Sequence, residues 1–110
     1  MIREQRRHPR VPVSIDGRWR GPNTGSLCKL TNLSLGGCFA RTLSTPAVNE
    51  PALVTVYLGR GMMEFPGRVV RVEPGVGFGL QFGEMGSETR HQLGQQITQI
   101  GRQAAARGPG

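Results

Sequence analysis

Short stretches of alternating apolar and polar residues make up most of the chain before residue 84. Val11, Val13 and Ile15 are separated by polar residues or by Pro12, a pattern typical of a strand with one buried face. Similar apolar stretches recur along the chain, with turn-forming residues between them. The pattern predicts six strands, at residues 11–20, 26–33, 38–41, 52–58, 62–72 and 76–82.

Glycine and proline mark the connections between these strands. Short turns are predicted at residues 21–25, 35–37, 59–61 and 73–75, and a longer loop at residues 42–51. Pro66 and Gly67 fall inside the fifth strand. A proline cannot donate a hydrogen bond to a neighbouring strand, so a bend is expected at this point.

The apolar pattern changes to a helical period after residue 86. Ser87 is a typical helix start, and Leu93, Ile97 and Ile100 form one apolar stripe. Gly101 is expected to end this helix. Six strands followed by one helix predict an all-β fold, a six-stranded antiparallel β-barrel with a C-terminal helix.

The expected organisation is one domain with short flanking segments. It comprises a flexible Arg-rich arm (1–10), the barrel (11–83), the C-terminal helix (84–101) and a disordered tail (102–110). A chain of 110 residues suffices for one modest core. No apolar run approaches the roughly 20 residues of a membrane helix. The first residues also lack the apolar stretch of a secretory signal, so a soluble, cytoplasmic protein without a membrane span is expected.

The chain is strongly basic, with a formal net charge of +7 and 14 basic residues, all but one of them arginine. This favours an anionic partner such as a nucleic acid, a nucleotide or an acidic membrane surface. Arginines gather in the arm, at positions 3, 6, 7 and 10. Guanidinium groups bind phosphates and guanine edges through paired hydrogen bonds. The arm is therefore interpreted as a segment that closes over a small polyanionic ligand and binds it. A GC-rich genome explains the scattered arginines equally well.

Few residues suit a metal centre or a catalytic site. Cys28 and Cys38 lack CxxC spacing and form no ligand pair with His8 or His91, so buried free thiols are expected. The sequence contains no nucleophile elbow, Walker loop or zinc-ligand set. We therefore expect that the protein is not an enzyme and needs no metal or cofactor.

The last predicted strand has two very different faces. One face carries only large apolar side chains, and the other carries Gly77, Gly79 and Gln81. A strand with a bare face lets another backbone or a flat ligand approach closely. A barrel corner that admits only glycine gives the same pattern, so both interpretations stay open.

Two motifs resemble the ligand site of the PilZ domains of bacteria. The motif RxxxR is matched by residues 6–10 (RRHPR), directly before a Val-Pro-Val strand start. The motif D/N-x-S-x-x-G is matched by residues 32–37 (NLSLGG), and residues 77–82 (GFGLQF) are similar to a late family strand of pattern G-x-G-V-x-F. The resemblance covers residues 5–83, with both motifs at the family's spacing.

The resemblance implies a small six-stranded barrel that binds the bacterial second messenger cyclic di-GMP. Arg6 and Arg10 would bind guanine edges and phosphates, and Arg7 would stack on a base or reach a phosphate. Asn32 would hydrogen-bond the Watson–Crick edge of a guanine. The remaining implied ligand-binding residues are Ser34, close to a phosphate or base, and the glycines Gly36, Gly37 and Gly79.

Some details of the motifs leave alternatives open. Asn32 stands where the family more often has Asp, and an amide oxygen is a weaker acceptor than a carboxylate. Arg3 and Arg7 also satisfy RxxxR, although the Val-Pro-Val start favours the register given above. Gln5 precedes the motif where some relatives have another arginine, so the sequence leaves open whether one or two ligand molecules bind.

The expected function is a cyclic di-GMP receptor or adaptor whose arm changes conformation on binding and signals to a downstream protein partner. The alternatives are a nucleic-acid-binding basic β-barrel and a PilZ-like protein-interaction module that binds no nucleotide. Phe39, Phe78 and Phe82 are expected in the core, which leaves few aromatic platforms for stacking nucleic-acid bases. Nucleic acid is therefore the less favoured partner, and salt dependence would separate it from a dinucleotide.

Overall fold

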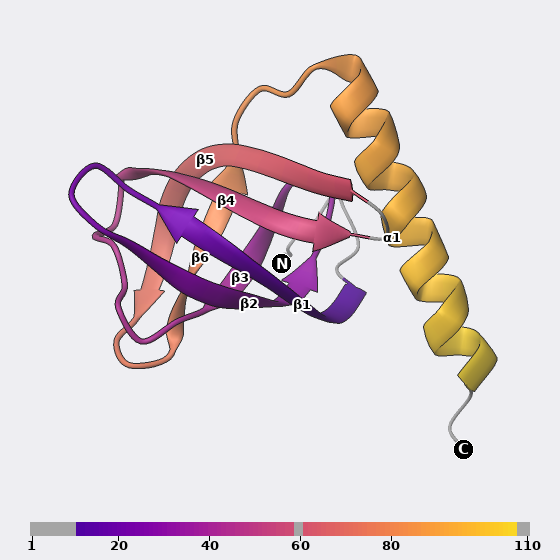
Figure 1. Cartoon of the computed structure of the whole chain (residues 1–110), viewed down its shortest axis with the longest axis horizontal. Helices are drawn as coiled ribbons and strands as arrows, with labels where there is room; N and C mark the ends of the chain where they lie inside the picture. The colour runs from indigo at the N-terminus through magenta and orange to yellow at the C-terminus, as the bar shows by residue number, and fades with distance from the viewer. Residues whose placement is uncertain (1–10, 59–60, 108–110) are drawn as a thin grey trace, which may run out of the picture.

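The computed structural model describes residues 11–58 and 61–107 (Figure 1). The elements are β1 (Val11–Arg20), β2 (Gly25–Leu33), β3 (Gly37–Arg41), β4 (Pro51–Leu58), β5 (Gly61–Glu73), β6 (Gly77–Phe82) and α1 (Ser87–Arg107). Every predicted strand is present, with ends within one residue of those predicted. The six strands pair antiparallel in the closed order β1-β2-β3-β6-β5-β4. The predicted six-stranded antiparallel barrel with a C-terminal helix is confirmed.

The first strand closes the barrel because it pairs along both of its edges. On one edge it pairs with β2, from Val11 opposite Leu33 to Arg20 opposite Gly25. On the other edge its second half pairs with β4, from Gly17 opposite Val56 onward. A closed ring of strands leaves no unpaired edge, which protects a small β protein from edge-to-edge association.

The inward faces of the strands form one apolar core. Its largest fully buried side chains are Trp19, Phe65, Phe78, Leu30, Leu33, Leu80, Leu93, Val54, Val56, Val69 and Cys38. The edge of the Trp19 ring packs against Phe78, with ring centroids 5.3 Å apart. The indole Nε1 donates to Thr42 Oγ1 at 3.2 Å, and that hydroxyl donates to the Leu27 carbonyl at 3.1 Å. The polar atom of the buried tryptophan is therefore satisfied, as buried indoles require.

Pro66 does not interrupt the pairing of the fifth strand. Pro66 pairs in register with Leu53, and its carbonyl accepts a hydrogen bond from Gly83 N at 2.8 Å. Pairing with β6 starts only at Gly67. The missing N–H group of Pro66 therefore costs no hydrogen bond between β5 and β6. The register shift in β5 lies further along, between Val69 and Arg71.

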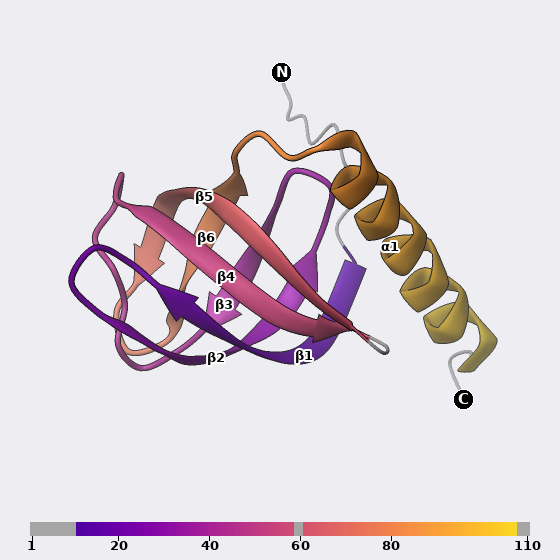
Figure 2. The same ribbon diagram turned by 45° about the horizontal axis from the view of Figure 1, so that its top comes forward.

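The helix lies beside one end of the barrel, and its C-terminal half runs past the strands (Figures 1 and 2). Leu93 is completely buried in the barrel core, and Ile97 packs against that core. The helix continues to Arg107 and so passes Gly101, where the sequence pattern places its end. A helical glycine costs about 1 kcal/mol relative to alanine. The alanines that follow at 104–106 favour the helix enough to carry it through.

Within the described part of the chain, α1 lacks the apolar length that crossing a membrane requires. The described residues also contain no group of three or more His, Cys, Asp or Glu side chains placed to hold a metal ion. Cys28 and Cys38 are buried, as predicted, and are not joined by a disulfide bond. Burial raises the pKa of the Cys28 thiol to about 11.

Candidate ligand-binding site

The connection between β2 and β3 is a tight turn held by the hydroxyl group of Ser34. Its Oγ accepts hydrogen bonds from the backbone N–H groups of Gly36 and Gly37, each at 3.1 Å. The hydroxyl donates to the Gly37 carbonyl at 3.3 Å, and Ser34 N donates to the same oxygen at 2.9 Å. Ser34 is only 4% exposed. This serine therefore fixes the backbone between the predicted ligand residues on either side of it.

The same turn is attached to β6 on the other side of β3. Phe82 N donates to the Gly36 carbonyl at 2.9 Å, and Gly37 pairs with Gln81. A side chain on Gly37 would collide with the backbone carbonyl oxygen of Leu80. Strand packing thus requires glycine at position 37, whatever the ligand.

Four residues form a row across the outside of the barrel, on β2, β3, β6 and β5. Asn32 pairs with Phe39, Phe39 pairs with Gly79, and Gly79 pairs with Arg71. Directly paired residues of adjacent strands project to the same face of a sheet. Cys38 and Leu80, which neighbour these residues in sequence, face the core. We call Asn32, Phe39, Gly79 and Arg71 the outer row.

Two irregularities in strand pairing bring the ends of this row to the outer face. The register shifts between Leu30 and Asn32 in β2, and between Val69 and Arg71 in β5. Leu30 and Val69 are core residues, so strict alternation would turn the residue two positions later inward as well. An extra residue in a strand re-aims the side chains that follow it. Here the extra residues turn the amide and the guanidinium outward.

Phe39 is buried at 6% exposure, but it is not part of the barrel interior. Its ring lies beneath Arg71, whose guanidinium carbon is 5.4 Å from the ring centroid. The prediction that Phe39 is a buried core aromatic is confirmed, although its ring lies outside the main cluster of core side chains. Phe39 lies between two interior residues, Cys38 and Ala40, and this alternation already placed it on the outer face.

Arg71 was missed by sequence reasoning. Besides its contact with Phe39, its Nη2 lies 3.3 Å from Oε2 of Glu73. Its side chain nevertheless stays 61% exposed. Counting in steps of two from buried Val69 would turn Arg71 inward, whereas counting from Val72 turns it outward; the register shift between Val69 and Arg71 reconciles the two.

Gly77 and Gly79, on the face of β6 without large side chains, differ in whether the surrounding backbone would accept a side chain. A side chain on Gly77 would collide with the carbonyl oxygen of Ala40. A methyl group on Gly79 would meet nothing closer than Val70 Cγ2 at 3.7 Å and Arg71 Cβ at 3.8 Å, which are ordinary contacts. The barrel-packing interpretation therefore explains Gly77. Gly79 is also buried, but the backbone around it does not exclude a methyl group.

The predicted arginines of the arm, Arg6, Arg7 and Arg10, lie outside the described residues. The description starts at Val11, which pairs with Leu33, and Pro12 pairs with Asn32. The chain therefore enters the barrel directly beside the Ser34 turn and one end of the outer row.

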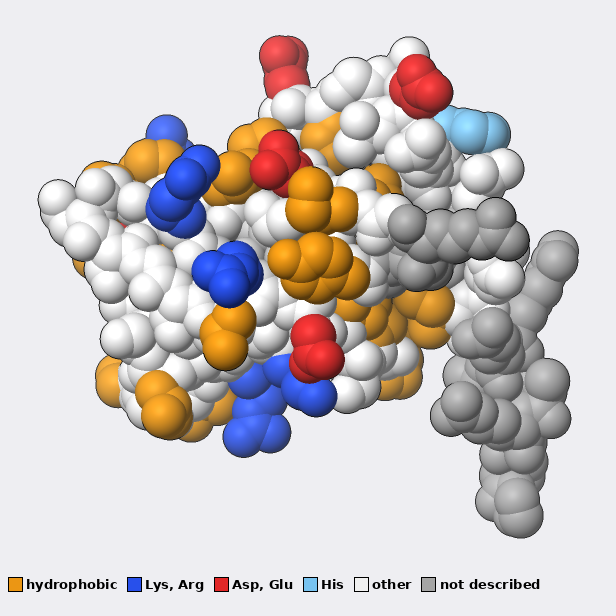
Figure 3. Space-filling view, viewed as in Figure 1, with side chains coloured by type: hydrophobic (Ala, Val, Ile, Leu, Met, Phe, Trp, Pro, Cys, Tyr) orange, Lys and Arg blue, Asp and Glu red, His pale blue; other side chains and the backbone are white. Residues whose placement is uncertain are grey.

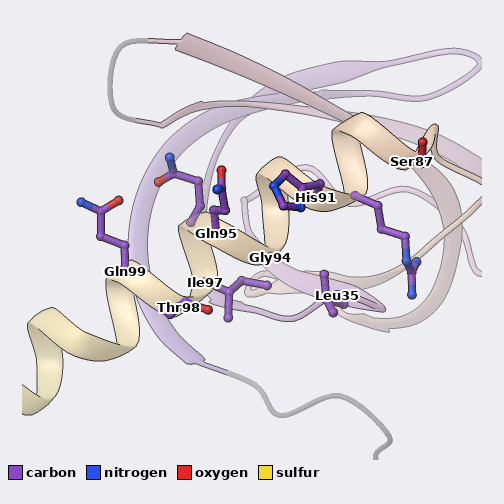
Figure 4. Close-up of a pocket in the computed structure, with 10 residues that line it drawn as sticks. Leu35, Ser87, His91, Gly94, Gln95, Ile97, Thr98 and Gln99 are labelled. Carbon is purple, nitrogen blue, oxygen red and sulfur yellow. The ribbon is translucent and has the colours of Figure 1, made fainter.

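The helix contacts this turn from another side (Figure 4). Leu35, in the turn, extends toward α1, and its Cδ2 lies 3.9 Å from the position of a side chain on Gly94. A hollow here is lined by Leu35 and by helix residues that include His91 and Ile97. The turn thus connects the outer row to the C-terminal helix.

Charged side chains on the face seen in Figure 1 are mixed in sign rather than gathered into one basic surface (Figure 3). On the face seen in Figure 1, basic groups are separated by acidic and apolar side chains (Figure 3). Lys29 forms an ion pair with Asp16 at 3.2 Å, with both side chains exposed. This face does not offer the continuous basic track that nucleic-acid backbones favour.

The PilZ domain family model matches residues 4–99 of the chain. Comparison with curated proteins finds no significant match. Among solved structures, the PilZ domain of YcgR from Escherichia coli with c-di-GMP is 18% identical, with a TM-score of 0.76 over 94% of this chain and 97% of that chain. YcgR from Escherichia coli in complex with c-di-GMP is 18% identical, with a TM-score of 0.82 over 94% of this chain and 49% of that chain.

A third similar structure is the inhibitor of motility (MotI/DgrA) of Bacillus subtilis. It is 15% identical, with a TM-score of 0.75 over 96% of this chain and 54% of that chain. The chain thus spans about half the length of the longer structures and nearly all of the isolated PilZ domain. At these identities the likeness establishes a shared fold.

Proposed function

Because the chain belongs to the PilZ domain family, we propose that it is a cyclic di-GMP receptor whose N-terminal arm folds over the outer row when the ligand binds. The observation that carries this proposal is the strand register. It places Asn32 next to Pro12 on one side and Phe39 on the other, with Gly79 one strand further. Val11 and Pro12, which directly follow the RxxxR motif in sequence, thus pair beside the second motif, and this supports a shared ligand site.

The ligand itself is suggested by chemistry and by a structural neighbour. Cyclic di-GMP carries two phosphates and two guanines, which suit arginine forks and an amide. The PilZ domain of YcgR, which has the same fold, was solved with c-di-GMP. We propose that Arg6, Arg7 and Arg10 bind its phosphates and guanine edges, and that Asn32 hydrogen-bonds the Watson–Crick edge of one guanine.

The remaining motif residues have supporting roles in this proposal. The Ser34 hydroxyl is engaged within the turn, so it holds Gly36 and Gly37 in place at the edge of the ligand. Gly79 carries no side chain beside Phe39 that would keep the ligand away from the strands. In this proposal the barrel supplies a rigid surface under the ligand, and the arm supplies most of the positive charge that binds the phosphates.

Such a division makes the arm a switch. Ordering a backbone costs roughly 1–2 kcal/mol per residue, so several charge-assisted bonds must form together before the arm is fixed. The ordered arm and the adjacent Ser34 turn then present a new surface to a downstream protein. Leu35 extends the same change toward α1.

Titration calorimetry of the wild-type chain with cyclic di-GMP tests this proposal. We expect saturable binding with a defined stoichiometry and a modest dependence on salt. Single-stranded DNA titrated under the same conditions is the control, because a backbone-binding protein loses affinity steeply as salt rises. Absence of binding to cyclic di-GMP would refute the proposal, and tight, salt-sensitive DNA binding would favour the nucleic-acid alternative.

A further inference from the structure

Arg71 lies at the opposite end of the outer row from Asn32, on a strand that carries neither family motif. We propose that Arg71 is a further ligand-binding residue of this chain, which stacks its guanidinium on the second guanine of cyclic di-GMP. This inference rests on the proposed function and adds to it a contact that the two motifs do not contain.

The geometry prepares the guanidinium for stacking before any ligand arrives. The guanidinium carbon of Arg71 lies over the Phe39 ring, 5.4 Å from the ring centroid. The side chain is still 61% exposed, so the group is accessible from outside the barrel. Planar guanidinium groups stack on aromatic rings and on nucleic-acid bases. A guanine resting on Arg71 would extend a stack that begins with Phe39.

The position of Arg71 also fits a ligand with two bases. Asn32 and Arg71 are separated by three strand spacings, about 14 Å at ~4.8 Å each on a flat sheet and less on a curved barrel. One guanine at each end of the row would place the connecting ring of sugars and phosphates near Gly79. Gly79 contributes no side chain at that position.

The ion pair with Glu73 does not compete strongly with such a contact. The Nη2 to Oε2 distance is 3.3 Å, and both side chains are largely exposed. Exposed pairs of this kind contribute little free energy. The pair limits the rotamers of Arg71, while stacking uses the flat face of the guanidinium and leaves the bond to Glu73 intact.

Titration calorimetry of three arginine variants with cyclic di-GMP tests the inference. Arg71→Ala is expected to weaken binding by about ten-fold, the loss typical of one stacked base. Arg71→Lys is expected to weaken binding nearly as much, because lysine keeps the charge but has no flat face. Arg18→Ala removes the same charge from an exposed position on β1 and is expected to change affinity by less than about two-fold.

Thermal unfolding of each variant shows whether the barrel is retained. Arg71→Ala binding as tightly as wild type would overturn the inference while leaving the receptor function in place. Full affinity in Arg71→Lys would overturn the stacking role, since charge alone would then suffice. If the wild-type chain itself fails to bind cyclic di-GMP, both the proposed function and the proposed Arg71 contact are refuted.

Discussion

Gly79 lies directly opposite Phe39 across the β3–β6 pair, so a buried ring borders a position that has no side chain. The nearest atoms to a methyl group at position 79 are at ordinary contact distances. The fold would therefore accept a small side chain there.

Gly79→Ala is expected to separate ligand binding from stability. Its free energy of unfolding should stay within about 1 kcal/mol of wild type, because a strand alanine also reduces the entropy of the unfolded chain. Affinity for cyclic di-GMP should fall, because the methyl group occupies ligand space. Gly37→Ala is the matched comparison: it meets the Leu80 carbonyl and should lose about 1–3 kcal/mol of stability. Equal behaviour of the two variants in denaturation and calorimetry would contradict this distinction.

Ser34→Ala tests the role of the turn. The substitution leaves the N–H groups of Gly36 and Gly37 without their acceptor, at a place where water has little access. We expect a loss of about 1–3 kcal/mol in the free energy of unfolding, measured by chemical denaturation. Ser26→Ala, at an exposed position on β2, should change it by less than about 0.5 kcal/mol. A fully stable Ser34→Ala protein would show that these hydrogen bonds do not hold the turn.

The arm arginines are expected to act on binding alone. Arg6→Ala and Arg10→Ala should abolish or strongly reduce cyclic di-GMP binding, because each removes several charge-assisted bonds. The thermal unfolding temperature of the free protein should remain close to wild type. Arg18→Ala again controls for the loss of one charge. Wild-type affinity in either arm variant would remove that residue from the site.

Cys28 is expected to make the stability of the protein depend on pH in the alkaline range. Burial raises the pKa of its thiol from 9.0 to about 11, so the folded chain keeps the proton after the unfolded chain has lost it. Its contribution to stability is therefore complete below about pH 9 and is lost as pH rises toward about 11.

Thiol alkylation measures the same property directly. Near pH 8 the folded protein should react slowly at Cys28, because the thiolate is the reactive form and burial also limits access. The urea-unfolded chain should react fast. Modification of Cys28 at equal rates in both states, read by peptide mass spectrometry, would contradict the buried, protonated thiol.

The strands were predictable from the sequence because alternation records which side chains face the core. Val11 to Arg20 is an example, since its apolar residues recur at every second position until Trp19. The outer row was not predictable in the same way. Asn32 and Arg71 face outward only because an extra residue precedes each of them, and an extra residue looks like ordinary strand sequence.

The motif residues illustrate a second limit of sequence reasoning. The spacing of Asn32, Ser34 and Gly37 indicated a ligand site, but it did not show how each residue serves that site. Gly37 is required by the approach of the Leu80 carbonyl, and Ser34 by the hydrogen bonds of its turn. The need for glycine at position 37 and serine at position 34 depends on how closely segments that are separate in sequence approach each other. The helix likewise outlasts Gly101, because one glycine costs less than the following alanines contribute.

An amide-resolved NMR titration of the isotope-labelled chain with cyclic di-GMP tests the central claim most directly. If the ligand binds across the outer row, the largest shifts will fall on Asn32, Phe39, Gly79 and Arg71 and on the Ser34 turn. The amides of Arg18 and Thr55, on the outer face where β1 meets β4, will move little. Largest shifts at Arg18 and Thr55, with the outer row unchanged, would contradict the account.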